Sequence, residues 1–109
     1  MAYDEAIADR IRDHLSGLPS LTERKMFGGL AFMVNGNMAC GPVGDALIVR
    51  VGPEAYDDAL SHPEADEMKF TGRPMRGFVE VEIGALEKDE LLLEWVCRGV
   101  DFASSLPAK

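Results

Sequence analysis

The chain has 109 residues, of which 47% are hydrophobic and 28% charged, and 19 acids against 11 bases give a formal net charge of −8. This size and composition predict one globular domain over residues 1–109, and the acidic balance argues against direct DNA binding, which depends on Lys and Arg at the phosphates. No apolar run approaches the roughly 20 residues of a membrane span, and the acidic start is unlike a secretory signal, so we expect a cytoplasmic protein without membrane contact.

The first predicted element is a helix over residues 4–16. Ile7, Ile11 and Leu15 recur every four residues, while charged residues occupy the other face. The stretch Ser16-Gly17-Leu18-Pro19 is expected to end this helix, because Gly can cap it and Pro cannot continue it.

Between residues 21 and 51 the hydrophobic period changes to two. Leu30, Phe32 and Val34 are predicted to face a core from one strand. Asn35-Gly36 then predicts a two-residue hairpin turn, because both positions of that turn need positive φ.

Two further strands are predicted after this turn, over about 37–42 and over 46–51, with a turn at Gly44-Asp45 between them. The second of these strands is rich in β-branched residues and reads as a central strand. Such short connections predict an antiparallel meander.

The rest of the chain predicts a helix from Pro53 to Ser61, an irregular segment over 64–69, a strand over 75–83 and a final helix over 87–104. Val79, Val81 and Ile83 are expected to point to one side of that strand. The predicted order is α-β-β-β-α-β-α, an α+β domain in which one layer of helices packs on an antiparallel sheet.

The sequence resembles the N-terminal domain of the TfoX/Sxy family. The stretches that carry the resemblance, in family order, are Arg24-Lys25-Met26-Phe27-Gly28-Gly29, the Asn35-Gly36 hairpin, Asp45 to Val51, Gly72-Arg73-Pro74-Met75-Arg76-Gly77 and Leu93-Glu94-Trp95-Val96. The resemblance implies an α+β fold related to secretion-chaperone-like folds. Two-domain members regulate natural competence, as transcriptional co-activators alongside the cAMP receptor protein, and the family supplies no catalytic residues.

Two cysteines and two histidines are the candidates for nucleophilic or metal chemistry. Cys40 is a candidate reactive thiol, but no His or cationic residue is placed by the sequence to activate it, so burial as a small apolar side chain is favoured. Cys97 is expected to pack within the last helix. With His14 and His62 these residues show no close metal-ligand spacing, so no metal and no cofactor are expected.

Five basic residues form the candidate binding site. They stand in two Gly- and Pro-containing stretches of an acidic chain, as Arg24, Lys25, Lys69, Arg73 and Arg76. If the stretches meet in space, they form a positive patch for a carboxylate, a phosphate or an acidic partner. Pairing with nearby acids or simple solvation is the competing interpretation.

The methionines around the hairpin and the 69–76 loop leave a similar choice open. Flexible Met side chains suit adaptable interaction surfaces, and they fill irregular cores equally well.

These observations favour a non-enzymatic regulatory domain that binds a protein partner or a second copy of itself, linked to transcriptional regulation of the competence type. The alternative is a small anionic ligand-binding protein or a thiol-dependent enzyme with a pocket near Arg24, Arg73 and Arg76.

Overall fold

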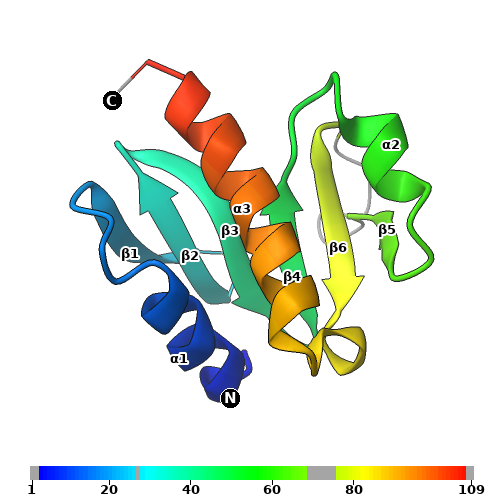
Figure 1. Ribbon diagram of the computed structural model, residues 1–109, viewed down its shortest axis with the longest axis horizontal. Helices are drawn as coiled ribbons and strands as arrows, with labels where there is room; N and C mark the ends of the chain where they lie inside the picture. Colours follow the sequence, from blue (N-terminus) through cyan, green and yellow to red (C-terminus); the bar gives the residue numbers. More distant parts are fainter. Residues whose placement is uncertain (1–2, 27, 69–75, 108–109) are drawn as a thin grey trace.

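The computed structural model describes residues 3–26, 28–68 and 76–107 of the protein. Figure 1 shows helices lying across one face of a twisted sheet. The elements, in chain order, are α1 (Glu5–His14), β1 (Leu21–Met26), β2 (Gly29–Val34), β3 (Asn37–Val43), β4 (Ala46–Arg50), α2 (Tyr56–Leu60), β5 (Ala65–Glu67), β6 (Phe78–Glu82), a 3-10 helix (Ile83–Leu86) and α3 (Asp89–Ser105). The predicted α+β class is confirmed. None of the described helices has the length and apolar character of a membrane span.

The described strands form one antiparallel sheet in the order β1-β2-β3-β4-β6-β5. The first four are consecutive hairpins, as the predicted meander requires. The chain then leaves the sheet through α2 and returns so that β6 pairs with β4 and β5 lies outside it. The edges of the sheet are therefore β1 on one side and the three-residue β5 on the other.

The Asn35-Gly36 turn has the predicted geometry. Asn35 has φ 53° and Gly36 has φ 81°, so both central residues are left-handed, as the two-residue hairpin turn of this type demands. The turn fixes the register in which Val34 pairs with Asn37.

The main core lies between the sheet and the two long helices. It holds Ile7 and Ile11 of α1, apolar residues of the facing strands, and Trp95 of α3. Gly99 lets α3 approach β3, because a Cβ at this position would lie 2.2 Å from the Ala39 carbonyl oxygen. The helix therefore packs backbone against backbone at this point.

The opposite face of the sheet has a second apolar cluster. Its buried members are Ala31, Met33, Met38, Val43, Ile48 and Met68. Three of the six methionines thus serve as core, while Met75 lies outside the described residues.

Two strands were not predicted. The segment 21–26, expected only to lie within a region of period two, is the full edge strand β1, and the segment predicted as irregular contains β5. Both are edge strands with mostly polar residues, because one side of an edge strand faces solvent and needs no apolar alternation.

Other boundaries differ at the ends of elements. The helix expected to begin at Pro53 begins at Tyr56, and the strand expected over 75–83 covers Phe78–Glu82, with Ile83 in the 3-10 helix. Val79 and Val81 are buried on the predicted side. Gly77, at φ 96°, precedes β6, and its carbonyl accepts hydrogen bonds from the N–H groups of Val51 and Gly52.

Candidate functional site

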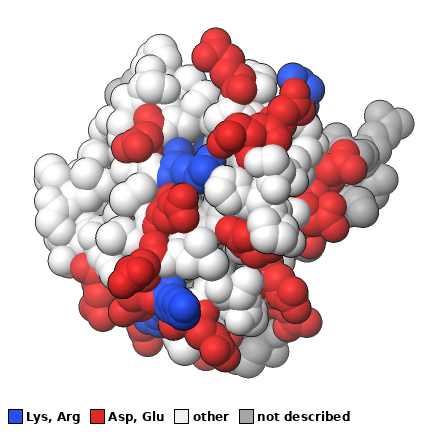
Figure 2. Space-filling view, turned by 45° about the vertical axis from the view of Figure 1, so that its right-hand side comes forward, with Lys and Arg blue, Asp and Glu red and all other residues white. Residues whose placement is uncertain are grey.

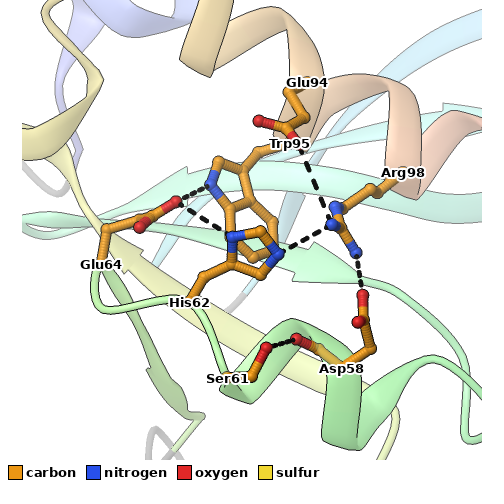
Figure 3. A network of polar contacts seen from close by, with 7 residues as sticks. All are labelled: Asp58, Ser61, His62, Glu64, Glu94, Trp95 and Arg98. Atoms are coloured by element: carbon orange, nitrogen blue, oxygen red, sulfur yellow. Dashed lines mark hydrogen bonds and ion pairs between the residues drawn. The ribbon is translucent and has the colours of Figure 1, made fainter.

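A network of polar side chains joins the segment after α2 to helix α3 (Figure 3). The buried Trp95 donates its indole N–H to Glu64 Oε2 at 3.0 Å. Only 12% of the Glu64 side chain is exposed, and the ring of His62 lies edge-on to the indole with the centroids 5.3 Å apart. Because a buried indole N–H needs an acceptor, this bond ties the chain entering β5 to α3.

Arg98 of α3 contacts both His62 and Asp58 at the outer side of this network. Its Nη2 lies 3.0 Å from His62 Nε2, and its Nη1 donates to an Asp58 carboxylate oxygen at 3.3 Å. A guanidinium carries only donors, so His62 Nε2 accepts, and the ring proton sits on Nδ1, 3.8 Å from Glu64 Oε2. The guanidinium carbon also lies 5.0 Å from the centroid of the Trp95 ring.

We call His62, Glu64, Trp95 and Arg98 the clasp. The nearby Ser61 donates its hydroxyl to the Asp58 carbonyl and is not aligned with His62, as a nucleophile and its base would be. Among the described residues, no group of three or more His, Cys, Asp or Glu side chains is arranged to hold a metal ion. The contacts of the clasp connect the segment after α2 to α3, and Arg98 also connects it to Asp58 of α2.

Two open pockets flank the clasp. One, of about 530 Å³, lies beside Glu64 and is rich in carboxylates; its acidic lining is Asp45, Glu64, Asp66, Glu80 and Glu82. The other, of about 480 Å³, lies beside Arg98 between residues 51–55 and the end of α3, where Phe102 and Asp101 contribute. Open pockets with mixed walls suit side chains of a protein partner better than an enclosed substrate.

Negative charge is divided unequally along the chain. Residues 1–50 contain 6 acids and 5 bases, whereas residues 51–109 contain 13 acids and 6 bases. Figure 2 shows acidic side chains spread over the side of the molecule where α2, β5 and α3 lie, with few basic ones among them. The clasp therefore sits within a strongly acidic surface.

The structure does not bring the described members of the predicted basic cluster together. Arg24 and Lys25 are exposed on the edge strand β1, whereas Arg76 precedes β6, with β2, β3 and β4 between. Four strand spacings separate β1 from β6 by about 19 Å. Lys69 and Arg73 lie outside the described residues, and a binding role for these five residues stays a prediction.

Arg76 already has an aromatic neighbour. Its guanidinium carbon lies 5.4 Å from the centroid of the buried Tyr56 ring in α2. This contact places Arg76 against the α2 end of the molecule, beside the acidic surface.

The two cysteines differ in their surroundings. Cys40 is buried on β3, and loss of solvation, with a smaller effect of Cys97, raises its pKa to about 12. Its thiol is therefore protonated at neutral pH, which favours the packing role over that of a reactive nucleophile. Cys97, expected to pack within its helix, is exposed instead, so that expectation is wrong. Its position falls on the solvent side of α3, next to the buried Val96.

The clasp was not predicted from the sequence. In the sequence, His62 stands out only as one of two histidines without metal-ligand spacing, and Trp95 only as part of a stretch that carries the family resemblance. The one available signal was the single Trp of the chain, whose buried N–H had to find an acceptor. Nothing in the sequence indicated that Glu64, 31 positions away, supplies it.

A family model described as the TfoX N-terminal domain matches residues 13–103 of the chain. No curated protein and no solved structure showed a significant match. The matched range contains every described strand, the clasp and α3 up to Ala103, so it spans the architecture given above. The chain belongs to the TfoX N-terminal domain family.

Proposed function

We propose that this protein is a regulatory domain that works by contacting a protein partner through the acidic surface of α2, β5 and α3. The observation that carries the proposal is the excess of 13 acids over 6 bases in residues 51–109, together with the carboxylates that line the pocket beside Glu64. A surface of one sign attracts a partner of the other sign and rejects polyanions. The partner is therefore a protein with a basic surface.

The clasp supports this proposal because it gives the surface a fixed shape. Trp95 and Glu64 hold the start of β5 against α3, and Arg98 holds Asp58 of α2 in the same arrangement. A contact surface held in its binding conformation loses less conformational entropy when a partner binds.

Family membership supports a regulatory role of the kind that TfoX proteins have in competence. Proteins that act on DNA carry basic surfaces, and an acidic domain can reach transcription through such a protein without touching DNA itself. Regulation through protein–protein contacts is therefore the function we propose.

A pair of matched charge reversals tests the surface. Asp57→Lys with Asp101→Lys places two positive charges on the exposed acidic surface, and Glu5→Lys with Asp13→Lys makes the same change on α1. We expect the first variant to lose a partner that the wild type and the second variant both retain in affinity capture. Equal retention by the two variants would rule out the acidic surface as the contact.

A second readout tests the regulatory role separately. Deleting the gene in its source cell should change a defined set of transcripts, and the wild-type protein and the α1 variant should restore them. An unchanged transcript profile after deletion would exclude a regulatory function, whatever the capture experiment shows.

A further inference from the structure

The edge strand β1 is a long, accessible template for strand pairing. It has six residues, pairs only with β2 among the described strands, and lies at the rim of the sheet with no described element beyond it (Figure 1). The opposite edge, β5, has three residues and lies within the acidic half. An exposed edge of the length of β1 pairs readily with another strand unless charge or shape prevents it.

The charge of the strands next to β1 favours a second copy of this chain as the partner that pairs with it. Residues 21–50, which hold β1 to β4, contain 2 acids and 3 bases, so this part of a chain with net charge −8 carries no excess of negative charge. Two copies that meet at β1 keep their acidic halves at opposite ends of the assembly. Contact through any surface of α2 or α3 would instead bring the two acidic halves together.

The side chains of β1 indicate the register in which the β1 strands of two copies would pair. Glu23 and Lys25 lie opposite Phe32 and Leu30 of the helix-face core, so both point to the helix face, whereas Arg24 lies opposite Ala31 on the other face. A two-fold axis perpendicular to the sheet keeps each residue on its own face. An antiparallel pair of β1 strands is therefore centred on one residue that lies opposite its own copy.

Centring on Arg24 sets Glu23 of each copy opposite Lys25 of the other, which yields two pairs of opposite charge. Centring on Glu23 sets the two Glu23 carboxylates opposite each other and leaves Lys25 opposite Leu21. Centring on Arg24 also sets the two Arg24 guanidiniums opposite each other. Directly opposed like charges destabilise a strand pair and opposed unlike charges stabilise it, so the two Glu23–Lys25 pairs offset this single like-charge pair, whereas the Glu23-centred register has a like-charge pair with no such offset.

The ion pairs that Glu23 already makes are compatible with its pairing with Lys25 of a second copy. Arg12 of α1 binds Asp9 at 2.6 Å and Glu23 at 2.7 Å, so the three side chains together carry one net negative charge beside the edge. Lys25 is exposed, and within the described part of the chain no ion pair engages it. Lys25 of a second copy would balance the negative charge of this group.

We propose that two copies of this chain pair through antiparallel β1 strands centred on Arg24, which extends the two sheets into one. This self-association is independent of the partner contact proposed for the acidic surface, and either can be wrong without the other.

Sedimentation equilibrium over a wide concentration range tests the pairing and its charge dependence. The wild type should pass from monomer to dimer. Lys25→Glu should raise the dimer dissociation constant at least tenfold, because Glu23 then faces a carboxylate. Lys88→Glu makes the same charge change on an exposed residue outside the sheet, just before α3, and should leave the constant within a factor of two. A wild-type monomer at millimolar concentration, or equal effects of the two variants, would overturn the proposal.

Disulfide cross-linking tests the register in a Cys97→Ser background. Arg24→Cys places two thiols directly opposite each other, with Cα atoms about 4.5–5.5 Å apart, within the range of a disulfide. Thr22→Cys places them about 14 Å apart along the strands. With oxidised glutathione, we expect Arg24→Cys to give a covalent dimer and Thr22→Cys to give no covalent dimer. Equal cross-linking of both variants, or none from Arg24→Cys, would overturn this register.

Discussion

Trp95 of α3 and Glu64 at the start of β5 share a hydrogen bond of 3.0 Å between a buried indole and a carboxylate that is itself 12% exposed. Neither element needs the other for its own backbone hydrogen bonds. The bond instead determines how the α2–β5 segment lies against the last helix, and hence the shape of the acidic surface.

The first prediction concerns this bond. Glu64→Ala leaves the indole N–H of Trp95 buried without an acceptor, which should lower the free energy of unfolding by about 1–3 kcal/mol. Urea unfolding followed by the fluorescence of Trp95, the single Trp of the chain, measures the loss. Asp66→Ala removes a neighbouring exposed carboxylate and should change stability by less than about 0.5 kcal/mol. Equal losses for the two variants would contradict a special role for Glu64.

A second prediction concerns the approach of α3 to β3. In an open helix Gly→Ala stabilises by about 1 kcal/mol, but at Gly99 the added methyl would meet the Ala39 carbonyl. We expect Gly99→Ala to destabilise by about 1–3 kcal/mol, since the helix must move away from the sheet.

Gly17→Ala is the matched control for that substitution. No heavy atom lies within 4 Å of the position where its Cβ would be. Thermal unfolding of both variants should show a lowered Tm for Gly99→Ala and little change for Gly17→Ala. A Tm for Gly99→Ala at or above the wild-type value would show that α3 lies farther from β3.

The third prediction concerns thiol reactivity. The pKa of Cys40 is about 12, and the thiol is buried, so at pH 8 only about one molecule in 10⁴ carries a thiolate there. Cys97 is exposed. Titration of the native protein with a disulfide reagent should show one reactive thiol, and titration in guanidinium chloride should show two. Loss of the native signal in Cys97→Ser identifies the residue, whereas fast reaction of that variant would restore Cys40 as a candidate nucleophile.

The fourth prediction concerns pH and the ion pair between α1 and β1. The hydrogen bond from Arg12 lowers the pKa of Glu23 below its ordinary value of 4.5. Because the folded-state pKa is depressed, the stabilisation is present above pH 4.5 and is lost as pH falls through the lower folded pKa. Both side chains are partly exposed, so its size should be at most about 1 kcal/mol.

NMR titration of the Glu23 carboxyl carbon checks this directly. Arg12→Gln should return the Glu23 pKa towards 4.5 and remove the corresponding part of the acid dependence of stability. An unchanged Glu23 titration in that variant would show that Arg12 is not the cause.

The parts of the fold that were predicted share a strong local signal. Helix α1 and the β2–β3 hairpin follow from a clear hydrophobic period and from an Asn-Gly pair whose backbone preference decides the turn. Strands β1 and β5 have no such signal, because edge strands need no alternating apolar side chains. β1 becomes a strand through its pairing with β2, and β5 through its pairing with β6.

The site was less predictable than the fold. Whether Arg24 and Arg76 meet depends on the order of the strands, and pairing of β6 with β4 leaves β1 at the far edge. The clasp likewise depends on how α2 docks against α3, since Arg98 and His62 are 36 positions apart. Spacing along the chain carries no information about such contacts.

The unequal division of acids between the two halves of the chain makes the molecule an electric dipole. In the field of a cationic surface it experiences a torque, which turns the side with α2 and α3 forward before any atoms touch. At physiological ionic strength this orientation acts over roughly 8 Å, so its effect should appear in the rate of encounter and fade as salt is added. The field of a second copy has the opposite sign, so the torque is reversed. It turns two approaching copies with their acidic sides apart and their β1 edges facing.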